Sequence, residues 1–418
     1  MIPGGVSRNS VYRIPHPDYA AGGAGCVVTD VDGCQRIDFA NNMCSLIHGH
    51  AHQPTIDAVT AQLQRGTAFT LATEAETRFA RHLCGRNPGF EKIRFMNSGT
   101  EAVMCAIKLA RAISGRPKIA KCEGTYHGTY DFAEVSQSPG PDNWGSIDQP
   151  NSVPLAKGTP QSALDEVVII PFNDINRTLA ILDRHVNDLA AVMIDPLPHR
   201  VGLFPAENEF VSALRDWTNR NNALLIFDEV ISFRMSYGGA QDWFDARPDL
   251  TTLGKIIGGG FPVGAVAGKD EYMHAMDPGQ ASIPLPYSGT FSANPVTMTA
   301  GLATMECFDP GSIKLLNELG ELTRRELSQA IQRTGKPFCV TGGGSMFRIH
   351  PLAKPPSSYR ETYQDAGQQS VVRRLVEQLY QHGLMLIKTC SGALSTSITK
   401  DHVEQLVVAV EQVLRQEF

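Results

Sequence analysis

The sequence contains no long hydrophobic run and no excess of basic residues. No apolar stretch reaches the roughly 18 to 20 residues of a membrane-spanning helix, and the N-terminus has neither a basic start nor an apolar signal-peptide core. The 418 residues include 37 Lys and Arg against 43 Asp and Glu, a formal net charge of -6, and no basic run stands out. These absences argue against membrane and nucleic-acid partners. We therefore expect a soluble, cytoplasmic protein.

Disulfide and metal frameworks are also absent from the cysteine pattern. The nine cysteines are odd in number, and no two of them form a C-x-x-C pair. We interpret them as reduced thiols that serve mainly as small buried hydrophobic side chains. The sequence also contains no internal repeat and no low-complexity tract.

Two kinds of pattern divide the chain. Between about 90 and 270, short apolar runs alternate with helical patterns, which predicts a mostly parallel sheet covered by helices. After about 300, longer amphipathic helices predict a second, smaller domain, and 402–418 keeps helical spacing to the end. The runs expected to form strands are 93–96, 167–170, 191–194 and 224–227, followed in the smaller domain by 345–349 and 383–387.

The segment Asn97-Ser98-Gly99-Thr100-Glu101-Ala102 lies where a strand is expected to end and a helix to begin. Ser98 and Glu101 have the spacing of a capping box, and 101–114 continues as an amphipathic helix that Gly115 ends. The free amide groups and positive dipole end of such a helix suit a phosphate. The signal alone is only moderately specific, because every capped helix has the same ingredients.

Two further segments carry reactive side chains. Asp228 follows the apolar run 224–227 directly, which puts a carboxylate at the edge where open α/β sheets bind ligands, although a helix cap is the simpler interpretation. Lys255 lies in the apolar, glycine-rich segment 253–260. A lysine in apolar surroundings has a lowered pKa and can form a Schiff base. The segment is not a nucleotide-binding P-loop, because the lysine precedes its glycines.

A phosphate cradle, a buried carboxylate and a reactive lysine are together what pyridoxal phosphate requires. Nearly the whole chain resembles the class III pyridoxal-phosphate aminotransferases, and within them glutamate-1-semialdehyde aminomutase and the β-amino-acid aminotransferases. The segments that carry the resemblance are Ile2-Pro3-Gly4-Gly5, Asp30-Val31-Asp32-Gly33, NSGTEA at 97–102, Tyr126-His127-Gly128, FDEV at 227–230, LGKIIGGGFPVGA at 253–265 and SGTFSANP at 288–295.

The resemblance implies the fold type I architecture of pyridoxal-phosphate transferases, an α/β fold with a mostly parallel central sheet and helices on both faces. A large cofactor-binding domain is expected over 51–295. A smaller α+β domain is expected from the C-terminal part, 296–418, joined by the N-terminal segment 1–50. The partners implied are small amino and keto substrates.

The resemblance also implies roles for particular residues. Lys255 is expected to carry the cofactor, Asp228 to pair with its ring nitrogen, and Tyr126 to stack on its ring, and these three are the expected catalytic residues. Thr290 is expected to reach the phosphate of the neighbouring subunit, which implies a homodimer. The expected cofactor-binding residues are Ser98, Gly99, Thr100, Tyr126, His127, Asp228, Val230, Lys255 and Thr290.

Some positions depart from the aminomutase pattern. Asp195-Pro196 stands where relatives have Glu-Pro, so the wall beside the cofactor's 3'-oxygen is expected to differ. The N-terminal segment resembles the β-amino-acid aminotransferases, which places their carboxylate-binding arginine at Arg8, and Arg200 is a rival reader of an anion. The segment near Lys388 lacks the glutamate that aminomutases carry.

Two other segments allow alternatives. Residues 136–159 form a long loop without periodicity that is interpreted as a lid over the site, the simpler alternative being a surface excursion without a role. His48, His50 and His52 alternate as metal ligands can, but relatives carry a similar turn without metal. No metal is predicted.

Three functions compete. A transaminase passes the amine to a second substrate, whereas an aminomutase returns it to a neighbouring carbon of the same molecule. The long loop favours the aminomutase, while Arg8 and the missing glutamate favour the transaminase. The third, a cofactor-binding regulator without turnover, is disfavoured because all catalytic residue types are present and no DNA-binding domain is expected before the fold.

Overall fold

The computed structural model describes all 418 residues, which form two compact units. The large unit contains Asp57–Ile313 and the short segment Pro356–Tyr363. The small unit contains Met1–Ile56, Lys314–Pro355 and Gln364–Phe418. No sequence pattern indicated that residues 356–363 return to the large unit.

A seven-stranded sheet forms the core of the large unit. The strand order is β4-β12-β11-β10-β9-β5-β8, and every strand is parallel to the others except β12, which is antiparallel to both neighbours. The strands are β4 (Lys92–Met96), β5 (Lys118–Cys122), β8 (Val167–Ile170), β9 (Leu189–Ile194), β10 (Leu224–Asp228), β11 (Leu250–Gly254) and β12 (Gly264–Gly268). The four strands expected in this region are therefore confirmed.

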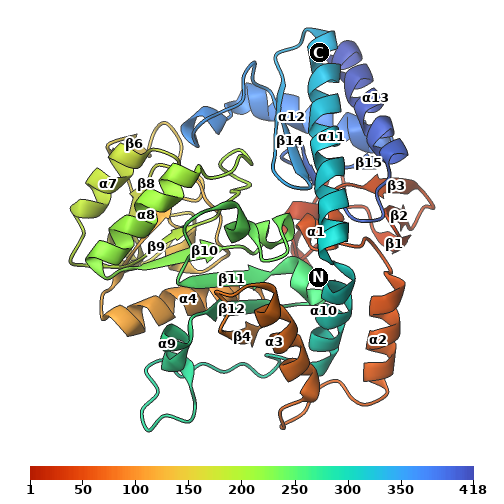
Figure 1. Cartoon of the computed structure of the whole chain (residues 1–418). Helices are drawn as coiled ribbons and strands as arrows, with labels where there is room; N and C mark the ends of the chain where they lie inside the picture. The colour runs from red at the N-terminus through yellow and green to blue at the C-terminus, as the bar shows by residue number, and fades with distance from the viewer. The chain divides into compact units, whose positions relative to one another are not determined.

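Both faces of this sheet are buried, as expected for parallel strands. Side chains alternate between two hydrophobic clusters, so that Leu224 and Ile226 belong to one and Leu225 and Phe227 to the other. The first cluster contains one face of helix α4, and the second contains residues of α7 and α8. Figure 1 shows α4 on one side of the sheet and α7 and α8 on the other. The helices are α4 (Gly99–Ser114), α7 (Ile175–Asp183) and α8 (Asn208–Asn221).

The ends of α4 explain why the helix begins and stops where it does. The Ser98 side chain accepts a hydrogen bond from the Glu101 amide at 3.1 Å. The Glu101 carboxylate accepts from the Asn97 amide at 2.9 Å, one residue before the position of a complete capping box. Gly115 adopts the left-handed conformation (φ 69°) that commonly ends a helix.

The remaining elements of the large unit are short helices and one small hairpin around the sheet. The longer helices pack at the β4 end, where α3 contacts α10. These elements are α2 (Gln53–Leu63), which begins in the small unit, α3 (Glu74–Arg86), α5 (Asp131–Glu134), α6 (Gln161–Asp165), α9 (Asp270–Met273), α10 (Pro295–Cys307), and the hairpin β6 (Gly145–Ser146) with β7 (Gln149–Pro150).

The small unit contains two separate sheets and three long helices. The first sheet has the order β1-β2-β3-β15 and the second has the order β13-β14-β16. The strand expected over 383–387 is limited to Leu384 and Met385, because Gly383 has a φ of 79°, although Ile387 still forms an isolated antiparallel bridge with Ser391. The elements are α1 (Asn41–Cys44), α11 (Pro310–Thr334), α12 (Ala366–Gln381), α13 (Lys400–Glu417), β1 (Ala20–Ala24), β2 (Val27–Asp30), β3 (Gln35–Asp38), β13 (Cys339–Thr341), β14 (Met346–His350), β15 (Leu384–Met385) and β16 (Ser391–Ala393).

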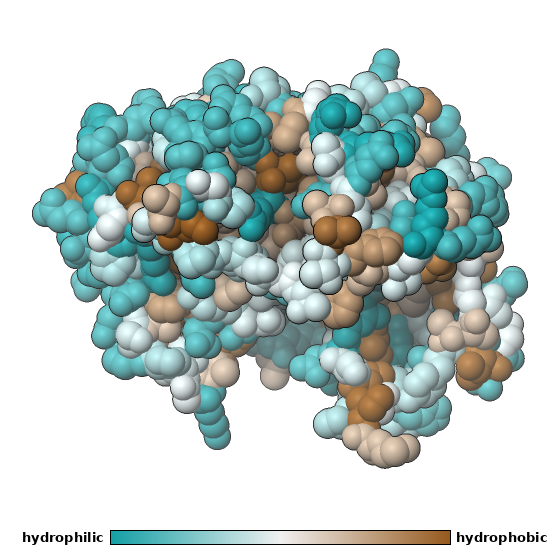
Figure 2. Space-filling model, turned by 90° about the horizontal axis from the view of Figure 1, so that it is seen from below, coloured by the Kyte–Doolittle hydropathy of each residue, from teal (hydrophilic) through white to brown (hydrophobic).

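The surface agrees with the lack of long apolar runs. No helix of the chain combines the length and apolar character that crossing a bilayer requires. Figure 2 shows separate hydrophobic groups among hydrophilic side chains on the face that it presents. All nine cysteines are free thiols.

Candidate active site

The candidate active site lies at the carboxyl edge of the large sheet. Ser98, Asp195, Asp228 and Lys255 each lie at or just beyond the end of one strand, respectively β4, β9, β10 and β11. Parallel strands deliver their carboxyl ends to one edge, and this is the edge where open α/β sheets bind ligands. In the register of the sheet, Asp228 pairs with Thr252 on the neighbouring strand, three residues before Lys255.

Four of the sequence motifs are in close contact at this edge. A methyl group on Gly99 would lie 3.0 Å from Cγ1 of Val230, and one on Gly254 would lie 3.2 Å from the same atom. A methyl group on Gly128 would lie 2.6 Å from Oγ1 of Thr100. Close packing therefore favours glycine at these positions and brings the N-terminus of α4 against Val230 and Gly128. The expected phosphate cradle has the geometry of an anion-binding helix N-terminus.

Asp228 is 4% exposed and its carboxylate is held by three donors. Oδ1 accepts from the Val230 amide at 3.1 Å and from the Thr252 hydroxyl at 2.9 Å. Oδ2 bonds with Nδ1 of His127 at 2.7 Å. Such an arrangement fixes the orientation of the carboxylate and stabilises its negative charge. Asp228, the expected partner of a cationic ring nitrogen, is therefore held in a fixed orientation.

His127 is fully enclosed and reaches Asp228 from the loop after β5. Burial lowers the pKa of His127, against the opposing effect of the Asp228 carboxylate. The neutral imidazole then donates its Nδ1–H to Asp228, while Nε2 has no hydrogen-bond partner. His127 therefore orients Asp228 and does not cancel its charge.

Lys255 begins a short 3-10 helix, Lys255–Gly258, immediately after β11. Its backbone has a φ of 49°, in the left-handed region that non-glycine residues rarely adopt. A strained conformation of this kind costs on the order of 1 to 3 kcal/mol and is typically found at functional sites. The strain turns the chain sharply at the sheet edge, directly after the contact of Gly254 with Val230.

The two acidic neighbours of Asp228 differ from it in their environment. Burial, with the nearby Asp228 charge, raises the pKa of Asp195 well above its ordinary range, and its Oδ1 accepts only from the Leu197 amide at 2.9 Å. Burial also raises the pKa of Glu229 to about 8, although Ala240 and Gln241 donate hydrogen bonds to it. Glu229 therefore holds the following segment in place.

Tyr126 is 41% exposed at the same edge. Burial of its remaining surface raises the pKa of Tyr126, against the nearby Arg200 guanidinium. Arg200 is exposed, and its Nη2 donates to the Ser138 hydroxyl at 2.9 Å. Tyr126 and Arg200 are therefore neighbours, as a substrate-binding role for Arg200 requires.

Lys121 is a residue of this region that the sequence reasoning missed. Its ammonium is fully buried and donates to the carbonyls of Thr125, Ala133 and Val135 at 3.0, 2.6 and 2.8 Å. Burial lowers the pKa of Lys121 to about 7. It holds the loop that carries Tyr126 and His127. A charged residue inside an otherwise buried strand was the available signal.

Arg8 and Thr290 are not joined to the motifs above by any described contact. Arg8 belongs to the small unit, where its Nη1 donates to Oδ1 of Asn42 at 2.5 Å. Asn42 is part of a left-handed turn, since all four residues of α1 have positive φ. Thr290 is exposed in the loop before α10. The roles expected for both residues remain predictions.

The three alternating histidines have partners in the protein. His48 bonds with the Thr396 hydroxyl, His50 with the Asp38 carboxylate and His52 with the Thr55 hydroxyl. The structure contains no group of three His, Cys, Asp or Glu side chains arranged to hold a metal ion.

With this geometry in view, comparisons with known proteins identify the family. The family model of class III aminotransferases matches residues 15–414, so the chain belongs to the class III aminotransferases. A glutamate-1-semialdehyde 2,1-aminomutase from Methanothermobacter thermautotrophicus is 36% identical, over 99% of this chain and 96% of that protein.

Solved structures of transaminases are similar as well. An omega-transaminase from Sphaerobacter thermophilus is 46% identical with a TM-score of 0.95, over 99% of this chain and 94% of that one. A β-phenylalanine aminotransferase from Variovorax paradoxus is 30% identical with a TM-score of 0.88, over 99% and 90% of the two chains. These similarities confirm the fold expected from the sequence.

The chain is therefore a pyridoxal-phosphate-dependent enzyme. Its residues fit the cofactor: the N-terminus of α4 suits the phosphate, and the buried Asp228 suits a protonated ring nitrogen. The Lys255 amine at the adjacent strand end suits the covalent attachment. When bound, the cofactor supplies an electron-withdrawing ring that makes the proton beside the substrate amine removable.

Proposed function

We propose that the protein is a transaminase that moves an amino group from a carboxylate-bearing amino acid, with β-amino acids as the donor class, to a separate keto or aldehyde acceptor. The observation that carries this choice is the 46% identity with an omega-transaminase, which exceeds the 36% identity with the aminomutase. The β-phenylalanine aminotransferase among the similar structures supports a β-amino acid as the donor class.

The proposed function divides among five groups of residues. Ser98, Gly99 and Thr100 bind the phosphate, and Tyr126 and Val230 enclose the ring. Asp228, oriented by His127, stabilises positive charge at the ring nitrogen. Nζ of Lys255 takes the proton from the amine-bearing carbon of the substrate. The remaining task, reading the substrate carboxylate, is proposed for Arg8, with Arg200 as the alternative.

The aminomutase is the second candidate, supported by the 36% identity with the Methanothermobacter enzyme. The two functions differ in their need for an acceptor. Purified holoenzyme should therefore be mixed with α-amino acids, β-amino acids or simple amines, without acceptor, while the absorbance of the bound cofactor is recorded. A transaminase stops after one amine per site and resumes when a keto acid is added.

The aminomutase predicts a different result in the same experiment. Glutamate-1-semialdehyde alone should then be converted continuously into its isomer, with no acceptor present. Continuous isomerisation, together with no response to the amino acids, would overturn the transaminase proposal. A single turnover with β-amino acids that a keto acid restarts would establish it.

We also propose a homodimer in which Thr290 completes the phosphate site of the partner. Exposed apolar side chains of the large unit support an interface, namely Phe69 at 53%, Leu71 at 81% and Phe291 at 59% exposed. Sedimentation of the holoenzyme should give a dimer or a larger even assembly, and Thr290→Ala should weaken cofactor binding without dissociating the assembly. An active, cofactor-saturated monomer would refute the shared site.

A further inference from the structure

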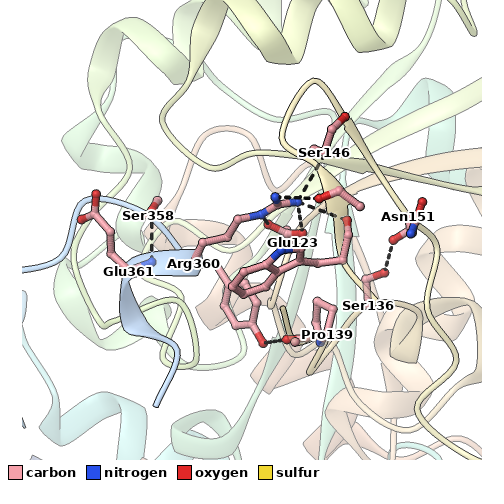
Figure 3. A network of polar contacts seen from close by, with 12 residues as sticks. Glu123, Ser136, Pro139, Ser146, Asn151, Ser358, Arg360 and Glu361 are labelled. Atoms are coloured by element: carbon pink, nitrogen blue, oxygen red, sulfur yellow. Dashed lines mark hydrogen bonds and ion pairs between the residues drawn. The ribbon is translucent and has the colours of Figure 1, made fainter. Parts of the chain in front are cut away.

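The segment Pro356–Tyr363 belongs to the large unit, although the chain on both sides of it belongs to the small unit. We call these eight residues the strap. The strap ends in a short 3-10 helix, Arg360–Thr362, and Figure 3 shows Arg360 reaching Glu123 and Ser146. No part of the proposed function uses the strap.

Arg360 donates hydrogen bonds from all three of its guanidinium nitrogens, to Glu123 and to the segment 144–146. Its Nε and Nη2 bind the two oxygens of Glu123 at 2.8 and 2.9 Å, a two-pronged ion pair in which Glu123 is only 3% exposed. Its Nη1 and Nη2 also donate to the carbonyls of Gly145 and Trp144 at 2.9 and 3.1 Å. The guanidinium lies 4.8 Å from the centre of the Trp144 ring. Lysine cannot reproduce this planar fork.

Tyr359 adds two contacts beside those of Arg360. Its hydroxyl donates to the Pro139 carbonyl at 2.8 Å. Its ring occupies the space next to Gly124, where a methyl group would lie 1.9 Å from Cδ2 of the ring. The strap therefore contacts residues 123 and 124 and also the loop 139–146.

Both segments lead to the active site. Glu123 and Gly124 precede Tyr126 by three and two residues, and Lys121 fixes the Thr125 carbonyl between them. Ser138, the residue directly before Pro139, binds Arg200 beside Tyr126. The chain that leads into Tyr126 is therefore held by the strap and by Lys121, and the residue that binds Arg200 is adjacent to a residue that the strap holds.

We infer that Arg360 is a positioning residue, which acts through Glu123 and the loop 139–146 to set the places of Tyr126 and Arg200 for substrate binding. The inference rests on the proposed roles of these two residues. It also implies that the strap holds residues 139–145, in the first part of the loop 136–159, in a fixed position. Proton transfer by Lys255, which directly follows a different strand, β11, should depend on Arg360 much less than substrate binding does.

The test compares Arg360→Lys, which keeps a charge opposite Glu123 but loses the fork, with the control Arg177→Gln. Arg177 pairs with Asp148, which also lies in the loop 136–159, but the two side chains are 45% and 74% exposed. An exposed pair of this kind contributes little to stability or position. Glu123→Gln is the second variant, because it keeps the shape of the buried partner should Arg360→Lys not accumulate as folded protein.

Hydrogen exchange of the cofactor-free protein gives the first measurement. Arg360→Lys should speed exchange of amides in 124–130 and 139–151 by at least about tenfold, because their local opening becomes easier, while the strand β10 stays protected. Arg177→Gln should leave both peptides unchanged. Equal exchange in the parent and in Arg360→Lys overturns the inference, whether or not the enzyme proves to be a transaminase.

The holoenzyme gives the second measurement. Arg360→Lys and Glu123→Gln should raise KM for the amino donor by about tenfold and leave kcat within about threefold. The visible circular dichroism of the bound cofactor should weaken, because a displaced Tyr126 no longer fixes the ring. A lower melting temperature with unchanged KM and unchanged circular dichroism would show that the strap only stabilises the fold. This result would overturn the positioning role.

Discussion

Asp228 and Asp195 stand at the carboxyl ends of adjacent parallel strands, and both are buried, yet their environments are opposite. Asp228 receives hydrogen bonds from Val230, Thr252 and His127. Asp195 receives one, from Leu197, and burial raises its pKa. The fold therefore supplies the same residue type twice at one edge and stabilises the charge at only one of the two positions. The number of donors distinguishes them.

The same reasoning separates the arginines of the large unit. Arg360 divides its donors among a carboxylate and several carbonyls, whereas Arg200 donates to one hydroxyl. An arginine whose donors are occupied holds protein segments together, and one whose donors remain available can bind an anion. Local saturation of hydrogen bonds thus distinguishes residues that build the site from residues that can meet the substrate.

The largest expected effect tests whether this strand edge performs the chemistry at all. Lys255→Ala should abolish turnover, because it removes the amine proposed to carry the cofactor and, with it, the base proposed to take the substrate proton. The measurement is the steady-state rate together with the visible absorbance of the bound cofactor. Normal activity in this variant would move the reaction away from the strand edge.

Asp228→Asn tests the buried carboxylate whose charge is stabilised by three hydrogen-bond donors. The variant should still bind cofactor and lose at least about a hundredfold in kcat, because asparagine cannot stabilise a cationic ring nitrogen in a buried site. Thr252→Ser is a matched control, since it keeps the hydroxyl that donates to Asp228. A rate within about threefold of the parent would contradict the proposed role.

Much of the large unit could be predicted because its causes are local. Buried parallel strands appear as apolar runs, such as 224–227, and Ser98 and Gly115 mark the ends of α4 within a few residues. The motif around Asp228 follows an expected strand, whereas β11, the strand that ends directly before Lys255, was not among the expected strands. The class III resemblance then supplied the cofactor.

The parts that could not be predicted depend on distant contacts. Glu123 and Arg360 are 237 residues apart, and neither belongs to a repeated pattern. The left-handed turn at Asn41–Cys44 contains no glycine that would announce it. Arg8 and its partner Asn42 are likewise separated by 34 residues. Single-sequence patterns describe neighbours along the chain and contain no information on such pairs.

Arg8 and Arg200 are the two candidates for binding the substrate carboxylate, and their variants show which of them has donors available for it. If Arg8 reads the substrate carboxylate, Arg8→Ala should cost roughly 2 to 4 kcal/mol in kcat/KM for carboxylate substrates and leave plain amines nearly unchanged. The measurement is kcat/KM for matched amino acids and amines in both variants. A selective loss in Arg200→Ala and none in Arg8→Ala would assign the task to Arg200.

Asp195→Asn should have the smallest effect on rate. It tests the buried carboxyl group that receives only one hydrogen bond. Asparagine has the same shape as the protonated acid and can still accept from the Leu197 amide, so kcat should stay within about threefold of the parent. A loss of a hundredfold would mean that Asp195 works as a charged group, and the contrast with Asp228 would fail.

The stability of the cofactor-free variant gives an independent check on Asp195. Because burial raises the pKa of Asp195, the folded protein retains a proton that the unfolded chain loses above about pH 4. The parent's free energy of unfolding therefore falls as pH rises from there through the raised pKa. The substituted asparagine cannot titrate, so the advantage of Asp195→Asn in urea unfolding should be least near pH 4 and grow toward neutral pH. Asp216→Asn, on the exposed side of α8, is the control and should show no such trend, and a pH-independent difference for Asp195→Asn would contradict a raised pKa.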